Sequence, residues 1–213
     1  LMYVSSGERN LDAEDPEKSP AQDLNRTLGK IVRLNDDGTA AAGNPYASQG
    51  GLAAEVWSYG HRNPLGIAFD PAGQLWNIEM APRGGDELNM VEKGANYGYP
   101  YVSNGNHYNG KVIPDHDTDD SFTKPKVWWN PVISPSSLMF YTGDKFTDWT
   151  GNAFISGLSS MSIIRVIVNN GNATEAQRFV MGKRIRGLEQ GPDGNIWAIE
   201  DGKGGRLLKL SPR

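Results

Sequence analysis

Short runs of apolar residues alternate with polar positions along the whole chain, and turn-forming residues separate most of these runs. The spacing is close to two residues, which is typical of β-strands, and no sustained helical period is present. Asp12–Leu28 is a short helical candidate, but Pro16 and Pro20 within it favour a loop. The pattern predicts an all-β fold with strands at Leu1–Ser5, Lys30–Leu34, Glu55–Tyr59, Gly66–Phe69, Gln74–Ile78, Glu87–Val91, Ser137–Tyr141, Asn152–Ser156, Ser162–Val168, Asn195–Ile199 and Arg206–Leu210.

Two segments repeat the same strand–turn–strand unit. Gly66–Glu79 reads GIAFDPAGQLWNIE and Gly187–Glu200 reads GLEQGPDGNIWAIE, so both contain a Pro-x-Gly turn and an aliphatic residue before tryptophan. A repeated hairpin among many short strands favours a β-propeller, with a β-sandwich as the alternative. A blade takes about four strands, so residues 1–213 are expected to form a single partial β-propeller domain of roughly three blades. We therefore expect a longer protein, or a partner that covers the open edges.

The composition narrows the class of protein. The chain has 213 residues, of which 38% are hydrophobic, which is enough to fill a core. A net charge of -4 without a basic stripe argues against nucleic acid as a partner. Cysteine is absent, which excludes a disulfide framework, a thiolate nucleophile and a thiolate metal site. No apolar run approaches the roughly 20 residues that span a bilayer, so no membrane span is expected.

Two groups of polar residues stand out. Gly60–Pro64 reads GHRNP and collects an imidazole, a guanidinium and an amide at one strand end. Taken alone, Arg62 would be an ordinary ion-pair residue and Asn63 an ordinary turn start before proline. Arg184 and Arg186 are two positions apart, which places both side chains on one face of a strand. Taken alone, they would form a solvated strand edge.

Together with the surrounding sequence, GHRNP resembles the soluble pyrroloquinoline-quinone (PQQ)-dependent sugar dehydrogenases. This is the glucose/sorbosone dehydrogenase family, which includes the bacterial aldose sugar dehydrogenases. The resemblance implies a six-bladed β-propeller with four-stranded antiparallel blades, and this chain is similar to about the C-terminal half of it. The segments that carry the resemblance are LGKIVRLNDDGT (28–39), NPY (44–46), GHRNP (60–64), EMAPRGGDELNMVEKGANYGYP (79–100), FYTGDKF (140–146) and RIRGLEQGPDGNIWAIED (184–201).

The resemblance implies an oxidoreductase that converts aldose sugars to lactones by hydride transfer to a calcium-bound quinone. An external acceptor would take the two electrons onward. By the same resemblance, the cofactor-binding residues are Arg62, Asn63, Arg184 and Arg186. Their chemistry suits the ligand, because guanidinium groups pair well with the carboxylates of a flat, tricarboxylated quinone.

The resemblance also implies calcium ligands. The backbone carbonyls of Ala81 and Pro82 would bind the ion that polarises the quinone. Asp86, Glu87 and the backbone of Tyr97 would belong to a second calcium site. Oxygen ligands of this kind suit a hard cation such as Ca²⁺. The alternative is a surface pair of carboxylates in a loop.

The chain departs from the family pattern at three points. The general-base histidine of the family lies upstream of this segment, and none of His61, His107 and His116 matches it. Ser159 occupies the position of a lysine that contacts the cofactor, and Glu200 replaces a small hydroxyl residue. These departures leave two alternatives to the enzyme: a non-catalytic propeller fragment, or a calcium-dependent sugar-binding module.

The family also suggests where the protein works. Its exported members act in the periplasm or outside the cell, and some are homodimers, but this sequence does not decide the oligomeric state. The substrate would be a small sugar, whose identity depends on loops such as Ser103–Phe122.

Overall fold

The computed structural model describes residues 1–12 and 14–212, which form β-strands, loops and four short 3-10 helices. No helix among these residues is long and apolar enough to cross a membrane. The strands are β1 (Met2–Ser6), β2 (Lys30–Leu34), β3 (Val56–Tyr59), β4 (Pro64–Phe69), β5 (Leu75–Glu79), β6 (Asp86–Met90), β7 (Val127–Trp129), β8 (Pro135–Phe140), β9 (Ala153–Gly157), β10 (Ser162–Asn169), β11 (Asn172–Val180), β12 (Ile185–Gln190), β13 (Ile196–Glu200) and β14 (Leu207–Leu210). The 3-10 helices are η1 (Ala47–Gln49), η2 (Gly51–Glu55), η3 (His116–Thr118) and η4 (Thr147–Trp149).

The all-β prediction is confirmed, and every strand predicted from the sequence is present. The described residues of Asp12–Leu28 form turns and no helix. The strands form four antiparallel sheets, somewhat more than the rough expectation of three blades. The difference has two causes. The sequence pattern missed β7, β11 and β12, and the first and last sheets have three strands each instead of four.

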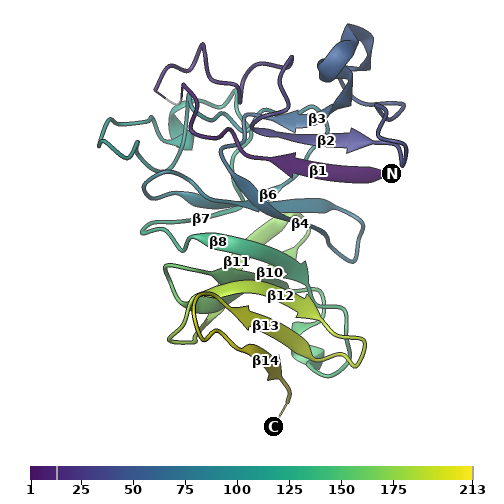
Figure 1. The fold of residues 1–213 in the computed structure, drawn as a ribbon, viewed down its shortest axis with the longest axis vertical. Helices are drawn as coiled ribbons and strands as arrows, with labels where there is room; N and C mark the ends of the chain where they lie inside the picture. The colour runs from purple at the N-terminus through teal and green to yellow at the C-terminus, as the bar shows by residue number, and fades with distance from the viewer. Residues whose placement is uncertain (13, 213) are drawn as a thin grey trace.

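The four sheets follow one another in chain order, as Figure 1 shows from top to bottom. Each sheet is a meander in which consecutive strands pair, in the orders β1-β2-β3, β4-β5-β6-β7, β8-β9-β10-β11 and β12-β13-β14. The strands β8 and β9 of the third sheet are largely buried on both faces. Leu138 and Phe140 pack with Trp76 of the second sheet, whereas Met139 packs with Leu188 of the fourth. Alternation along β8 therefore fills two cores, as expected for stacked blades.

The innermost strands β4, β8 and β12 run in the same direction. Side chains of β8 contact successive residues of β12, because Ser136 Oγ donates to the Ile185 carbonyl (3.1 Å) and Ser137 Oγ accepts from the Leu188 amide (3.1 Å). In the same way, Asp86, two strands from the start of β4, binds backbone amides at the start of β8. The starts of these three strands therefore lie at one end of the molecule.

Strand β1 runs in the opposite direction to β4. The Tyr3 ring lies 5.6 Å from the Phe69 ring at the end of β4, whereas Gly7, just after β1, touches Asn63 just before β4. A Cβ atom on Gly7 would collide with the Asn63 side chain, so this close approach needs glycine. The segment that follows β1 is thereby brought to the start of β4.

Candidate functional site

The candidate site lies where the three innermost strands begin. Each of these strands has an irregularity in its pairing one residue after its start, between Pro64 and Gly66, Pro135 and Ser137, and Ile185 and Gly187. Irregularities of this kind turn the chain and redirect side chains, and they are common beside active sites. Because the strands are parallel neighbours, Asn63, Ser134 and Arg184 are brought to the same end of the molecule.

Arg62 is a buried cation with fixed direction, and only 8% of its surface is exposed. Its Nη1 donates to the Met80 carbonyl (3.0 Å) and its Nη2 donates to the Tyr108 hydroxyl (3.1 Å). Its Nε lies 3.4 Å from a carboxylate oxygen of Glu8, which is also buried. Burial raises the pKa of Glu8, and the guanidinium opposes that shift. The site therefore holds Arg62 in place before any ligand arrives.

Asn63 is held by its backbone on one side and by Gly7 on the other. Its carbonyl accepts a hydrogen bond from the Met80 amide (3.0 Å), which links the start of β4 to the segment after β5. The side chain is half-buried and lies against Gly7. Arg62 and Asn63 thus follow from one local arrangement, in which Pro64 starts β4 directly after them.

Arg184 and Arg186 form a second cationic group. Arg184 Nε and Arg186 Nη2 both donate to the same oxygen of Asp201, at 2.8 and 3.1 Å. Both arginines are exposed, and Ile185 between them is buried. They therefore lie on the same side of the strand, as the spacing predicted. Asp201 uses only one N–H group of each guanidinium.

Buried polar atoms that make no hydrogen bond indicate whether these residues fit an anionic planar cofactor. Glu8 Oε2 and the Tyr99 hydroxyl are buried and have no hydrogen-bond partner among the described residues, and Arg62 Nε has only its ion-pair contact with Glu8 at 3.4 Å. Unpartnered polar atoms around a buried guanidinium are expected where a polar ligand binds. The residues therefore fit a carboxylate-bearing group. Arg184 and Arg186 are at the same end of the molecule, but they do not line the cavity that Arg62 lines.

The predicted calcium residues divide between two places. Ala81, Glu87 and Tyr97 line one small buried cavity of about 10 Å³, together with Glu79 and Arg62. That volume accommodates one water-sized sphere. Pro82 instead lines two larger open cavities next to Tyr108. The described residues contain no cluster of three or more His, Asp or Glu side chains arranged for a metal.

The small cavity nevertheless offers oxygen ligands. Asn89 Nδ2 donates to Glu79 Oε1 (3.0 Å) and to Glu87 Oε2 (3.3 Å), and His116 Nε2 lies 3.0 Å from Glu87 Oε1. Glu79 Oε2 is buried without a hydrogen-bond partner. Two buried carboxylates joined by one amide fit a small hard cation, and Glu79 Oε2 has a polar contact with His61 Nδ1 at 3.3 Å.

The Asp86 carboxylate accepts hydrogen bonds from three backbone amides. Its Oδ1 accepts from the Ala81 amide (2.9 Å), and its Oδ2 accepts from the amides of Ile133 (2.8 Å) and Ser134 (2.7 Å). The side chain is fully buried, and burial raises its pKa to about 6 against these hydrogen bonds. Asp86 therefore ties the predicted calcium loop to the start of β8, and its oxygens are already used.

His61 lies in the buried interior next to the small cavity. His61 is fully buried, its Nε2 lies 2.9 Å from Ser58 Oγ, and its ring stacks on Tyr97 with centroids 4.5 Å apart. Its Nδ1 lies 3.3 Å from Glu79 Oε2. Burial lowers the pKa of His61 strongly, so the ring is neutral near pH 7. His61 therefore packs behind the site and bonds locally to Ser58.

Glu79 should make the stability of the protein depend on pH. Burial raises its pKa to about 7, so its contribution to stability is complete at low pH and is lost as pH rises through about 7. We expect the difference in unfolding free energy between wild type and Glu79→Gln to fall by about 3 kcal/mol from pH 5 to pH 8. Urea titrations at each pH measure it. Glu189→Gln, an exposed carboxylate on β12, is the matched control, and an equal pH profile for both variants would contradict the prediction.

The structure shows the contacts of Ser159 and Glu200, the two residues that depart from the family pattern within this chain. Ser159 is exposed and its hydroxyl donates to the Val132 carbonyl (3.1 Å), beside the start of β8. Glu200 is buried and forms a two-pronged pair with Arg206, with distances of 2.6 and 2.9 Å. The negative charge of Glu200 is therefore balanced within the chain. The Ser159 hydroxyl is neutral and does not supply the charge of a lysine ammonium group.

Sequence reasoning missed four residues of this site. Glu8 and Tyr108 touch Arg62 from loops far away in the sequence, and no local pattern indicates them. Glu79 and Asp201 could have been found, because the repeated hairpin ends in glutamate in both copies and Asp201 follows the second copy directly.

Comparison with known proteins agrees with this arrangement. The model of the glucose/sorbosone dehydrogenase family matches residues 1–209. Aldose sugar dehydrogenase YliI of Escherichia coli (strain K12) is 39% identical over 217 residues, which cover 100% of this chain and 57% of the relative. The chain therefore spans little more than half the length of that relative.

Solved structures give the same result. The apo form of the soluble aldose sugar dehydrogenase from Escherichia coli superposes with a TM-score of 0.89 at 38% identity, covering 99% of this chain and 60% of that one. The PQQ-bound aldose sugar dehydrogenase from Streptomyces coelicolor superposes with a TM-score of 0.76 at 27% identity, covering 98% and 57%. The four sheets are thus blades of a β-propeller, and the chain belongs to the glucose/sorbosone dehydrogenase family, a family of oxidoreductases.

Proposed function

We propose that this chain carries the cofactor-binding part of a PQQ-dependent dehydrogenase that oxidises aldose sugars to lactones. The observation that carries the proposal is the buried Arg62, which is preset by Glu8 and Tyr108 and lies close to Glu8 Oε2 and the Tyr99 hydroxyl, two buried polar atoms without a hydrogen-bond partner among the described residues. The family match and the PQQ-bound relative from Streptomyces coelicolor support it.

The four predicted residues would act as a clamp on the cofactor. Arg62 and Asn63 at the start of β4 would bind one part of it, and Arg184 and Arg186 at the start of β12 would bind another. Guanidinium groups give two parallel hydrogen bonds to a carboxylate, which fixes orientation as well as position. Asp201 would keep the β12 pair together while leaving donors free for the ligand.

Calcium is part of the same proposal. The carbonyls of Ala81 and Pro82 would hold the ion nearest the cofactor, and Asp86 would keep that segment in place through the Ala81 amide. Glu87 and Tyr97 would hold a second ion, with Glu79 as an additional oxygen ligand. Glu79 Oε2, which makes no hydrogen bond among the described residues and lies 3.3 Å from His61 Nδ1, supports that assignment.

In the proposed reaction, the sugar loses a hydride from its anomeric carbon to the quinone and a proton from its anomeric hydroxyl to the general-base histidine that family members carry upstream of this segment, which gives the lactone. When bound, PQQ supplies a two-electron acceptor for that hydride. This chain would bind and orient the cofactor through buried, preorganised charges, which is where a site gains most in a low-dielectric setting. An external acceptor would then remove the electrons, and the periplasm or the cell exterior would be the place of action. A homodimer stays a prediction.

The proposal predicts a specific loss of cofactor affinity in Arg62→Ala. Removing a buried, charge-assisted hydrogen-bond donor should weaken PQQ binding about 100-fold, and Arg62→Lys should weaken it about tenfold. Absorbance titration of PQQ in the presence of Ca²⁺ measures both values. Arg178→Ala, which removes an exposed arginine of β11 paired with Glu175, should leave the affinity unchanged.

Two results of the PQQ titration would contradict the proposal. If wild type and Arg62→Ala bind PQQ equally, or if the wild type does not bind it at saturating Ca²⁺, the cofactor proposal is wrong for this chain. The non-catalytic fragment and the calcium-dependent sugar-binding module would then be favoured. Retention of the chain on a sugar matrix only in the presence of Ca²⁺ would distinguish these two.

A further inference from the structure

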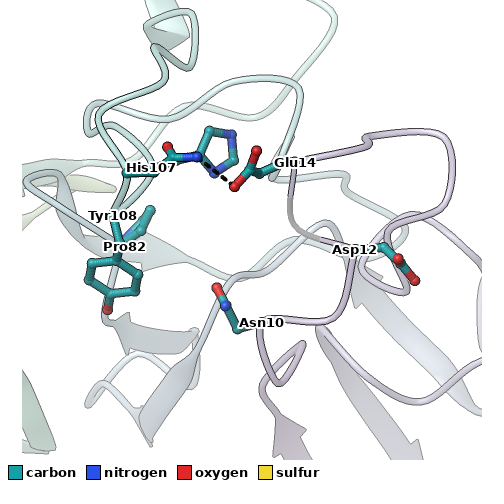
Figure 2. Close-up of a pocket in the computed structure, with 7 residues that line it drawn as sticks. Asn10, Asp12, Glu14, Pro82, His107 and Tyr108 are labelled. Carbon is teal, nitrogen blue, oxygen red and sulfur yellow. Dashed lines mark hydrogen bonds between the residues drawn. The ribbon is translucent and has the colours of Figure 1, made fainter.

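A larger cavity lies beside Tyr108, the residue whose hydroxyl accepts a hydrogen bond from Arg62. It has a volume of about 390 Å³ and is lined by Asn10, Asp12, Glu14, Pro82, His107, Tyr108 and Asn109. Figure 2 shows Glu14 and His107 close together along one side, and Tyr108 with Pro82 along another. This volume falls within the range of small-molecule sites.

His107 is the strongest sign that the cavity takes a ligand. The residue is only 7% exposed, yet its ring makes no hydrogen bond with the described residues. Burial lowers its pKa, so at pH 7 the ring is neutral and has one donor nitrogen and one acceptor nitrogen. A buried imidazole with both nitrogens unused is expected to face a hydroxyl-bearing ligand or water.

Glu14 places a carboxylate beside this ring. Asn109 Nδ2 donates to Glu14 Oε1 (2.7 Å), and Lys111 Nζ donates to the Glu14 carbonyl (3.0 Å). These bonds hold Glu14 against the 107–111 loop and leave its Oε2 without a hydrogen-bond partner among the described residues. Asp12 also lines the cavity, but Figure 2 shows its carboxylate turned away from Glu14.

The lining as a whole suits a polyhydroxylated molecule. It combines a carboxylate, a neutral imidazole and amides, which accept and donate hydrogen bonds, with the Tyr108 ring as an apolar wall. A metal ion is not indicated, because no three His, Asp or Glu side chains of the described residues are grouped to hold one. The lining residues include no lysine or arginine, and the nearby Lys111 ammonium group is hydrogen-bonded to the Glu14 carbonyl outside that lining.

We propose that this cavity is a sugar subsite for neutral or amino-substituted aldoses, in which His107 and Glu14 bind hydroxyl or ammonium groups and Glu14 disfavours acidic sugars. The inference rests on the proposed function, because Tyr108 both lines the cavity and accepts a hydrogen bond from Arg62. A sugar here would lie directly beside the proposed cofactor clamp.

The test compares three sugars of similar shape and different charge. Glucosamine, glucose and glucuronate are titrated into the 213-residue chain at pH 7 without PQQ, and the His107 ring signals are followed by NMR. All bound sugars should shift the His107 signals, which His107→Gln identifies by removing them. Glucosamine should bind about tenfold more tightly than glucuronate, since one carboxylate attracts the first and repels the second.

Variants separate the role of Glu14 from general charge effects. Glu14→Gln keeps an acceptor for Asn109 and removes the charge, so it should bring the glucosamine-to-glucuronate ratio close to one. Asp148→Asn removes an exposed carboxylate of η4 and should leave the ratio at about tenfold. Equal effects of the two variants would contradict the proposed role of Glu14.

The outcomes also separate this inference from the proposed function. If PQQ binds but no sugar shifts the His107 signals, or if glucuronate binds as well as glucosamine, the subsite is wrong and the cofactor proposal stands. If sugars shift His107 in the expected order and PQQ does not bind, the subsite stands and the cofactor proposal is wrong.

Discussion

Replacing Lys30 by methionine should lower the free energy of unfolding by about 4 kcal/mol. Lys30 is fully buried on β2, and its Nζ donates to the carbonyls of Pro20 (2.7 Å), Ala21 (2.9 Å) and Leu28 (2.9 Å). Methionine fills a similar volume but leaves all three oxygens without that donor. The melting temperature should fall by roughly 8–16 °C, as measured by thermal unfolding.

The buried ammonium group of Lys30 holds the loop that contains residues 20–28 by bonding its backbone carbonyls. Burial lowers the pKa of Lys30 to about 7, but only the ammonium form has three donors for three carbonyls. The loop it holds reaches the candidate site, because the Gly60 amide donates to the Ala21 carbonyl (2.9 Å) and the His61 amide to the Gly29 carbonyl (3.1 Å). Losing the charge should therefore also loosen the segment that carries Arg62.

Two comparisons make the Lys30 prediction decisive. Lys203→Met, an exposed lysine between β13 and β14, should change the melting temperature by no more than a degree or so, roughly the effect of a typical surface substitution. Hydrogen exchange at the Gly60 and His61 amides should become faster in Lys30→Met and not in the control. A stability loss below about 1 kcal/mol would show that the three carbonyls find other donors.

Asp86→Ala should be the second most damaging substitution, with a loss of about 3 kcal/mol. It removes the acceptor for three backbone amides, two of which lie at Ile133 and Ser134. Urea unfolding measures the loss, and Asp144→Ala, an exposed carboxylate after β8, is the control. Because the third amide belongs to Ala81, PQQ affinity should fall as well. Unchanged stability would mean that water satisfies these amides.

The strands could be predicted from the sequence where at least one face is buried. β13 shows the alternation, whereas β5 is a short apolar run that is buried along its whole length, and a Pro-x-Gly turn precedes each of them. β11 (Asn172–Val180) was missed because it is an edge strand with polar residues on both faces, and most of its side chains are exposed. Tertiary pairing with β10 makes it a strand, and no local pattern records that pairing.

The sequence pattern missed β12 and β7 for different reasons. β12 contains Gly187 and two charged residues, which break the alternation, although it is the innermost strand of its sheet. β7 has only three residues, too few for a periodic signal. The repeat between Gly66–Glu79 and Gly187–Glu200 could have located β12, since the two segments form equivalent hairpins, β4–β5 and β12–β13.

The candidate site was partly predictable for a related reason. Arg62, Asn63, Arg184 and Arg186 lie in short motifs, so their resemblance to the family is visible in the sequence. Their partners are not. Glu8 precedes Arg62 by many positions, and Tyr108 lies in a loop without a repeat. Such contacts depend on how β1 is oriented against β4, which is set by packing between sheets.

The pairing irregularities at the starts of β4, β8 and β12 have a consequence for protein engineering. Since all three strands share the same one-residue offset, the short segments that lead into them are geometrically equivalent modules. Exchanging such a segment between blades at equal length should preserve the outward direction of its side chains. Adding or deleting one residue there would instead rotate the next side chain to the opposite face of the sheet.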